Sequence, residues 1–242
     1  MPSYHSGQLF CVAMPIGNPR DITLRAVDVL GAVQIVACED TRTAKEALAA
    51  LGIRPPRLIS YFEHNEQDRT HQLVELLKAG NDVALISEAG TPGISDPGYR
   101  LVSACVANDI KVVPIPGANA AVTAMCASGL PPDRFLFVGF PPKKGARFQR
   151  FLASWMLPGV TTMFYLPARR MDEFALAMTT IAPTATVVVA RELTKTYEEF
   201  VRGTPAEIRD HYAANPPRGE CTILVRPVEQ DEDENEPGAP IR

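Results

Sequence analysis

The sequence predicts an α/β protein built from two α/β domains. Short apolar runs alternate with amphipathic helical segments along the first half of the chain, as expected for a layered α/β fold. The apolar runs are continuous rather than alternating in polarity, which is typical of parallel strands buried on both faces. The pattern changes after the Pro-Ile-Pro-Gly segment at 114–117, so we place a domain boundary at residue 116.

The first domain, residues 1–116, is expected to hold five strands and four helices. The helix over 22–33 rests on apolar residues near a spacing of 3.6, namely Ile22, Ala26, Val29, Leu30 and Val33. The helix over 66–79 is followed by a glycine, which favours its termination there. The expected strands cover 9–14, 34–38, 57–61, 82–87 and 110–114, and the other helices cover 41–51 and 97–107.

The second domain, residues 117–228, opens with a helix of small residues over 118–128. Strands are expected at 135–140, 161–166, 186–191 and 220–226, with helices near 148–155, 171–181 and 205–214. We interpret this order as an α/β domain with a mixed or antiparallel sheet. Residues 229–242 form an acidic tail without apolar anchors, a composition typical of disorder.

The formal net charge of −4 belongs to this tail, which holds six acids and one base. The first domain has 13 acids and 10 bases, and the second has 9 acids and 13 bases. Between Arg134 and Met171 there are seven bases and no acid. They are Arg134, Lys143, Lys144, Arg147, Arg150, Arg169 and Arg170. Such a segment can neutralise nucleic-acid phosphates, although a solvated loop is the simpler alternative.

The cysteine pattern indicates a cytoplasmic protein. Five cysteines are scattered without a CxxC pair, which favours reduced thiols and argues against a metal site. No window approaches the roughly 18 apolar residues of a membrane span, and residues 1–7 lack the apolar core of a signal peptide. We therefore expect no membrane association.

Three loops follow strands at the edge where α/β sheets bind ligands. The loop over 15–21 has one glycine, too few to cradle a pyrophosphate, and Asp21 is expected to cap the next helix. The loop over 87–98 has three glycines and two prolines, which let a ligand approach the backbone. Ser95 or Asp96 is expected to cap a helix that begins at Pro97. The loop over 116–121 suits either close helix packing or a flat ligand.

Polar clusters at 39–42, 64–66 and 191–195 also lie at strand ends. Asp40 or Thr41 in the first cluster and Asn65 in the second are candidates for helix caps. Arg42 and His64 have no such role, which favours a function in binding. Charged residues in the third cluster either form a solvated rim or face a cleft.

Together these motifs resemble the tetrapyrrole methylase superfamily of S-adenosylmethionine enzymes. The resemblance is strongest to the branch that methylates a ribose 2′-hydroxyl of a cytidine in 16S rRNA. It rests on the segments 15–18, 21–26, 39–42, 64–66, 87–98 and 191–195 and covers about residues 7–226. Glu88 stands where the family usually has Asp, and Pro19 stands where Leu is usual.

The resemblance implies a homodimer whose chains each bind S-adenosylmethionine in the cleft between two α/β domains. By analogy with the superfamily, the cofactor contacts are Ile16, Thr91, Ile94, Ala120, Ala121, Leu166 and Glu220. Small residues and backbone groups suit a folded sulfonium ligand that needs close walls. The implied substrate is 16S rRNA in the small ribosomal subunit, rather than DNA.

The chemistry needs a group that activates the ribose hydroxyl. Alignment of oxygen, methyl and sulfur supplies much of the acceleration, and a base or cation adds about 10²–10⁴-fold. We expect Lys195 and Glu192 to be the catalytic pair. His64 and Glu39 are alternatives, and the pair could instead be an ion pair at the rim.

The expected RNA contacts are Arg42, His64, Lys143, Lys144, Arg147 and Arg150. Two other functions stay open: a tetrapyrrole methyltransferase of the same fold, and a non-catalytic RNA-binding assembly factor. The clusters at 39–42 and 64–66 favour RNA methylation over the first. The intact Gly/Pro loop argues against the second, because a protein without a cofactor has no need of it.

Overall fold

The computed structural model describes residues 6–54, 57–143 and 145–228. It divides into two compact units: unit 1 comprises Met1–Thr123 and Glu192–Glu198, and unit 2 comprises Ala124–Arg191 and Glu199–Arg242. The division falls within helix α5 (Ala120–Ser128), whereas the expected boundary at residue 116 stays a prediction. The acidic tail over 229–242 lies outside the described residues.

Unit 1 is built on a parallel five-stranded sheet in the order β3-β2-β4-β1-β5. The strands are β1 (Leu9–Val12), β2 (Ile35–Cys38), β3 (Arg57–Ser60), β4 (Val83–Ile86) and β5 (Val112–Ile115). The helices are α1 (Leu24–Ala32), α2 (Thr41–Ala50), α3 (Glu66–Lys78) and α4 (Tyr99–Ala107). Because the strands are parallel, all the loops that follow them lie at one edge of the sheet.

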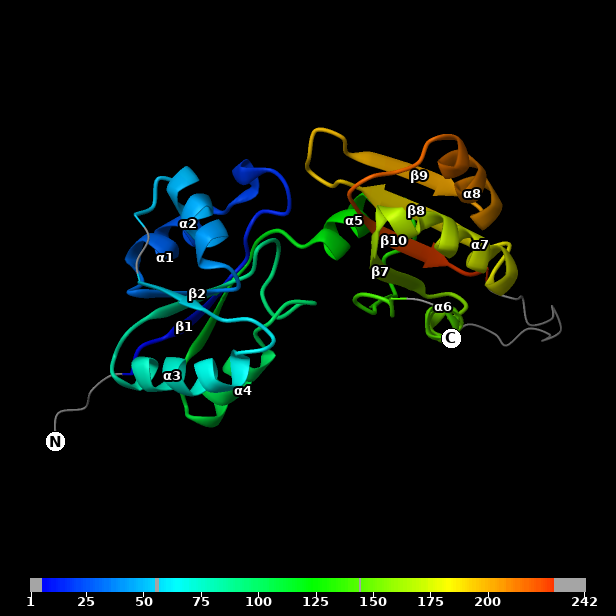
Figure 1. Ribbon diagram of the computed structural model, residues 1–242. Coiled ribbons are helices and arrows are strands. Elements are labelled where there is room, and N and C mark those ends of the chain that lie inside the picture. Colours follow the sequence, from blue (N-terminus) through cyan, green and yellow to red (C-terminus); the bar gives the residue numbers. More distant parts are fainter. Residues whose placement is uncertain (1–5, 55–56, 144, 229–242) are drawn as a thin grey trace, which may run out of the picture. The chain divides into compact units, whose positions relative to one another are not determined.

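Helices cover both faces of the unit 1 sheet (Figure 1). On one face Leu30 of α1 and Leu48 of α2 pack in a core with Val36 and Ile86. On the other face Leu73 and Leu101, from α3 and α4, belong to a second core. All residues of β2 and β4 are buried. The predicted parallel sheet covered on both faces is therefore confirmed.

The expected cap at Asp21 is wrong. Residues Pro19–Asp21 form a separate 3₁₀ turn, η1, which the side chain of Asn18 caps by accepting from Arg20 N. The cap of α1 is Thr23, whose hydroxyl accepts from Ala26 N at 3.1 Å. The 3₁₀ turn uses up Asp21 before the helix starts.

The expected caps at Ser95 and Asp96 are also wrong. Helix α4 begins at Tyr99, and the residue in the N-cap position is Gly98, with a φ of 153°. A Cβ atom at Gly98 would lie 3.1 Å from the backbone nitrogen of Gly93. The Gly/Pro loop therefore folds tightly back on itself and extends to residue 98 before the helix begins.

Unit 2 contains a mixed sheet, which is one of the two kinds predicted, and its strand order is β6-β7-β10-β8-β9. Strands β6 and β7 are parallel, and the other neighbours are antiparallel. The strands are β6 (Phe135–Phe137), β7 (Thr161–Pro167), β8 (Thr186–Arg191), β9 (Glu199–Gly203) and β10 (Glu220–Arg226). The helices that follow α5 are α6 (Ala146–Trp155), α7 (Met171–Ile181) and α8 (Pro205–Ala214).

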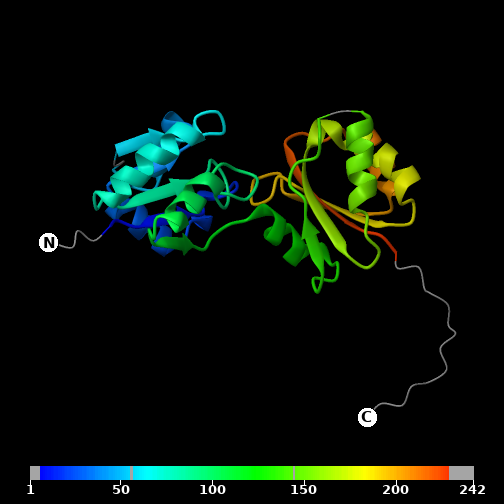
Figure 2. The same ribbon diagram turned by 90° about the horizontal axis from the view of Figure 1, so that it is seen from below.

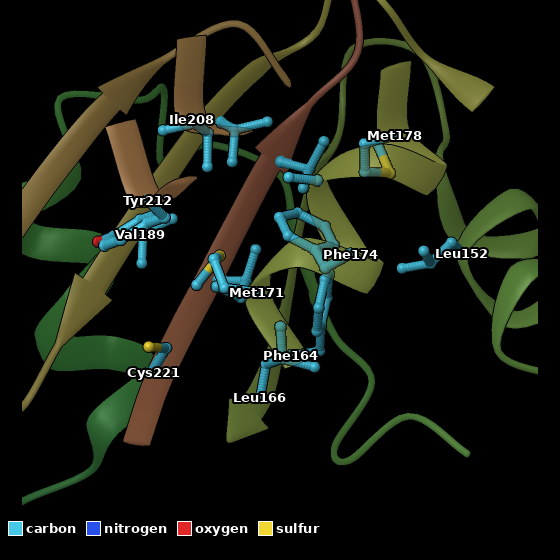
Figure 3. Packing of buried hydrophobic residues seen from close by; sticks show 14 of the residues in the cluster. Leu152, Phe164, Leu166, Met171, Phe174, Met178, Val189, Ile208, Tyr212 and Cys221 are labelled. Atoms are coloured by element: carbon cyan, nitrogen blue, oxygen red, sulfur yellow. The ribbon is translucent and has the colours of Figure 1, made fainter. Parts of the chain in front are cut away.

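Helices α6, α7 and α8 share one core with the unit 2 sheet, shown from close by in Figure 3. Phe164 of β7 meets Phe174 of α7 nearly edge-on, with 5.6 Å between ring centroids. Leu152 of α6 and Ile208 of α8 are fully buried in the same core. Figure 2 shows unit 2 from below, with its sheet seen at another angle.

Strand β9 is absent from the sequence-based prediction. It is the edge strand of its sheet and is only half-buried, with the pattern Glu-Phe-Val-Arg-Gly. Its side chains therefore show neither a continuous apolar run nor a strict alternation. Pairing with β8, from Glu199 opposite Arg191 to Gly203 opposite Val187, defines it.

Candidate functional site

The first loop and the Gly/Pro loop meet at the carboxyl edge of the unit 1 sheet. The backbones of Met14 and Gly90 exchange two hydrogen bonds, of 2.8 and 3.0 Å. Gly90 has a left-handed φ of 79°, and a Cβ atom there would lie 3.4 Å from Cγ2 of Ile16. Glycine therefore allows the close approach of backbone to Ile16 that a ligand-lining loop needs.

The third loop joins the same edge. The hydroxyl of Thr91 donates to the carbonyl of Ala118 at 3.1 Å. Oδ1 of Asn119 accepts from the backbone nitrogens of Ala121 and Val122, at 3.1 and 3.2 Å, and so caps α5. The structure thus places Ile16, Thr91, Ala120 and Ala121 on three loops that contact one another within unit 1.

A fourth segment, residues 192–198, completes this arrangement and also belongs to unit 1. A Cβ atom at Gly17 would lie 2.5 Å from Cγ of Lys195, and 2.8 Å from both the carbonyl oxygen of Leu193 and the hydroxyl oxygen of Thr194. Gly17 is therefore required by this contact. Sequence reasoning did not find it, because no local pattern links residue 17 to residue 195.

Lys195 and Glu192 form an ion pair, with 2.9 Å between Nζ and Oε1. Glu192 has a φ of 50° and Thr194 a φ of 66°, a left-handed conformation that costs about 1–3 kcal/mol outside glycine. Strain of this kind persists only where the surrounding structure enforces it, which is common at functional sites. The two residues thus form an ion pair whose lysine lies beside the first loop, and their catalytic role stays a prediction.

The order of the strands places His64, an alternative catalytic candidate, away from the first loop. His64 follows β3, at the edge of the sheet, whereas Ile16 and Gly17 follow β1. Three strand spacings separate β3 from β1, roughly 14 Å at the usual distance between strands. Glu39 follows β2, two spacings from β1. Among the four candidates, Lys195 is the one that lies against Gly17 of the first loop, and Glu192 is its ion-pair partner.

Three carboxylates gather where β2 and β4 end. Burial raises the pKa of the Glu39 carboxyl, and the charges of Asp96 and Glu88 raise it further. Burial also raises the pKa of Asp96 to about 6, against a hydrogen bond from Ser87 that lowers it and the charge of Glu88 that raises it. This edge of the sheet is therefore a region of negative potential.

A cavity of about 20 Å³ lies between these carboxylates and α2. Its lining includes Glu39, Asp40, Thr43, Ser87 and Glu88. A cavity of this size holds about one water molecule. The pocket is lined by apolar as well as polar residues and is too small to be the cofactor site itself.

The three other expected cofactor contacts, Ile94, Leu166 and Glu220, differ from one another in how exposed they are. Ile94 lies in the Gly/Pro loop and is 42% exposed. Leu166, on β7, is fully buried in the core of unit 2 (Figure 3), and neither its side chain nor its backbone is exposed. Glu220 is exposed at the start of β10, opposite Pro167. The roles of all these residues stay predictions.

The expected RNA contacts Arg42 and His64 are both exposed, at the ends of the neighbouring strands β2 and β3. Asp40 caps α2, as predicted, accepting from the backbone nitrogens of Arg42 and Thr43. Asn65 occupies the N-cap position of α3 without a side-chain cap bond. That expected cap is wrong, because its amide instead bonds Phe62 N and Ser60 O.

The basic segment is partly neutralised by acids that lie just outside it. Arg134 pairs with Asp133 at 3.4 Å, and Arg170 pairs with Glu173 at 3.0 Å. Lys143, Arg147 and Arg150 are exposed, at and just before the start of α6. Lys144, the remaining expected RNA contact, lies outside the described residues.

Comparison with known proteins identifies the family. The family model described as "Tetrapyrrole (Corrin/Porphyrin) Methylases" matches residues 8–209. The chain belongs to this family. Relatives named "Ribosomal RNA small subunit methyltransferase I" include a protein of Mesorhizobium japonicum that is 46% identical over 228 residues, which are 93% of this chain and 77% of that protein. The Pasteurella multocida protein of the same name is 44% identical and covers 97% of this chain and 84% of its own.

Solved structures confirm the fold class. Uroporphyrin-III C-methyltransferase of Thermus thermophilus, complexed with S-adenyl homocysteine, aligns with a TM-score of 0.61 and 17% identity over 91% of this chain and 97% of that one. A cobalt precorrin-4 methyltransferase aligns with a TM-score of 0.63 and 17% identity over 90% of this chain and 94% of that one. At these identities the likeness shows the two-domain α/β tetrapyrrole methylase fold.

The residues at the carboxyl edge of unit 1 fit S-adenosylmethionine. The absent or small side chains of Gly90, Ala120 and Ala121 let neighbouring groups approach the backbone closely. The carboxylates of Glu39, Glu88 and Asp96 give this edge a negative potential that suits a ligand carrying a sulfonium and an ammonium group. When bound, the cofactor supplies an electrophilic methyl group.

Proposed function

We propose that this protein transfers a methyl group from S-adenosylmethionine to the ribose 2′-hydroxyl of a cytidine in 16S rRNA of the small ribosomal subunit. The observation that carries the proposal is the meeting of the first loop, the Gly/Pro loop, the third loop and residues 192–198 in unit 1. Relatives named as small-subunit rRNA methyltransferases, 40–46% identical over nearly the whole chain, support the rRNA substrate.

In this reaction the loops of unit 1 hold the methyl donor, and alignment with the attacking oxygen supplies much of the acceleration. Lys195 and Glu192 act on the ribose hydroxyl. The ammonium of Lys195 stabilises the ribose oxygen as its proton passes to solvent water and its bond to the methyl group forms. Glu192 keeps the ammonium in place through the 2.9 Å ion pair. Such assistance is worth about 10²–10⁴-fold in rate.

The RNA is held by the exposed side chains of Arg42 and His64 in unit 1 and of Lys143, Arg147 and Arg150 in unit 2. Lys144, which lies outside the described residues, is a further proposed contact. The protein works as a cytoplasmic homodimer in this proposal. No helix within the described ranges is long and apolar enough to cross a membrane. A tetrapyrrole substrate is suggested by the description of the family and by solved structures of 17–18% identity, whereas the relatives of 40–46% identity are named as rRNA methyltransferases.

The decisive experiment offers labelled S-adenosylmethionine together with 30S subunits, free 16S rRNA or a tetrapyrrole. We expect the label to appear in a cytidine ribose of the rRNA, whether the rRNA is offered in 30S subunits, as free rRNA or in both forms. Label in the tetrapyrrole alone would contradict the proposed rRNA substrate. Calorimetry with S-adenosylmethionine tests the remaining alternative, since a non-catalytic assembly factor would show no binding at millimolar cofactor.

A further inference from the structure

Arg170 contacts the residue just before Lys143 and the residue just after Arg147. Its Nη1 donates to the carbonyl of Pro142 at 2.9 Å, immediately before Lys143. Its guanidinium carbon lies 4.0 Å from the ring centroid of Phe148, immediately after Arg147. The side chain of Arg170 thus links Pro142 to Phe148.

Arg170 is itself held firmly. Its Nε donates to Oε2 of Glu173, one turn into α7, at 3.0 Å. The side chain of Arg170 is only 13% exposed, and Phe148 is fully buried in the core of unit 2. The charge of Arg170 is therefore engaged within unit 2, unlike the exposed charges of Lys143 and Arg147.

We propose that Arg170 is a positioning residue, which through Pro142 and Phe148 places the neighbouring Lys143 and Arg147 where they meet RNA phosphates. This inference rests on the proposed function. A segment whose ends are already joined loses less conformational entropy on binding. Arginine is required because its planar fork donates hydrogen bonds in two directions while its face lies on an aromatic ring, which lysine cannot reproduce.

The test is a double-mutant cycle on RNA affinity. Arg170→Lys and Arg170→Met are each made in the wild type and in the Lys143→Ala/Arg147→Ala background. The dissociation constant of the rRNA substrate is measured at several salt concentrations. We expect Arg170→Lys to weaken RNA binding about tenfold in the wild type, a coupling usual for residues in contact. In the Lys143→Ala/Arg147→Ala background we expect less than about a twofold change.

Salt dependence and cofactor affinity distinguish positioning from general damage. Removing one phosphate interaction lowers the salt slope by about 0.9, so Arg170→Lys should lower it toward the value of the Lys143→Ala/Arg147→Ala variant. Affinity for S-adenosylmethionine should stay unchanged. Glu173→Gln is the matched control, because the Gln oxygen can still accept from Nε of Arg170 while the bond to Pro142 and the contact with Phe148 remain. This variant should keep RNA affinity within about twofold of the wild type.

The outcomes separate the inference from the proposed function. Equal losses from Arg170→Lys in both backgrounds would overturn positioning, since a direct contact or a general destabilisation is additive. No loss in the wild-type background would overturn it as well, while leaving the RNA surface intact. If Lys143→Ala/Arg147→Ala itself leaves RNA binding unchanged, the RNA surface of the proposed function fails and the inference falls with it.

Discussion

Gly17 lies against Lys195, so closely that a Cβ atom at Gly17 would come within 2.5 Å of Cγ of Lys195. The same atom would also meet the carbonyl of Leu193 and the hydroxyl of Thr194 at 2.8 Å. One residue of the first loop thus positions the segment that carries the proposed catalytic pair. Substitution at Gly17 therefore tests whether the contact supports function.

We expect Gly17→Ala to lower the free energy of unfolding by about 1–3 kcal/mol, the usual cost of forcing an extra methyl into a packed place. The loop over 192–198 must shift, because two of the three colliding atoms do not belong to the flexible end of a long side chain. Methyl transfer should fall at least about tenfold, since small displacements from reactive geometry are costly. Thermal unfolding and single-turnover methylation measure the two effects.

Gly31→Ala is the matched control for this variant. Gly31 lies in α1, is exposed, and an added Cβ atom would have no neighbour within 4 Å. Alanine is the better helix former by about 0.8–1.0 kcal/mol. Gly31→Ala should therefore leave methylation unchanged and stability equal or higher. A Gly17→Ala variant that behaves like Gly31→Ala would contradict the importance of the contact.

Removal of the Lys195 ammonium should reduce turnover by about 10²–10⁴-fold while both ligands still bind. Lys195→Met keeps the aliphatic stem beside Gly17 and Lys195→Ala does not, so the pair separates loss of charge from loss of packing. Pre-steady-state methylation and equilibrium binding are the measurements. Lys78→Ala removes a comparable i,i+3 partner of Glu75 on α3 and should have no effect. Near-normal turnover of Lys195→Met would discard the ammonium as the activating group.

The raised pKa of Asp96, about 6, predicts a pH-dependent effect on stability. An unfolded Asp has a pKa near 3.9, so between about pH 4 and 6 the folded state holds a proton that the unfolded state has lost. The contribution of Asp96 to stability is therefore fully present below pH 4 and is lost as the pH rises to 6. Asp96→Asn removes this dependence.

The Asp96→Asn variant should accordingly gain stability relative to the wild type as the pH rises from 4.5 to 7.5. Thermal unfolding of both proteins without cofactor, at these two values, measures the change in their difference. If the difference in stability between the two proteins is the same at both pH values, or favours the wild type more at pH 7.5, Asp96 does not have a raised pKa in the folded protein.

Replacing Lys143, Lys144, Arg147 and Arg150 by Ala should weaken rRNA binding and leave cofactor affinity in place. The salt slope should fall by about 0.9 for every phosphate that is no longer neutralised. Arg209→Ala is the control, because this arginine of α8 bonds the neighbouring Asp210 at 2.9 Å. RNA affinity that is unchanged in the fourfold variant, with a shallow salt slope in the wild type, would remove this surface from the function.

Much of the fold could be predicted from local patterns. The continuous apolar runs around Leu9 and Val83 indicated parallel strands, and helices α7 and α8 begin and end where expected. Strand β9 was missed, because a half-buried edge strand lacks a clear periodicity. The caps at Thr23 and Gly98 were missed because each helix begins later than expected, after a turn that includes the residues expected to cap it.

The candidate site was likewise predictable in part from the sequence and in part only from the tertiary structure. Parallel strands place all their following loops at one edge, so the loops carrying Ile16, Thr91 and Ala120 could be assigned to a common region from their strands alone. Contacts between distant segments could not be assigned, since the positions of Gly17 against Lys195 and of Arg170 between Pro142 and Phe148 depend on how whole elements pack. The same holds for charge: composition counted Arg170 as a free base and Asp96 as an ordinary acid, whereas burial and neighbours in the folded chain engage the first and raise the pKa of the second.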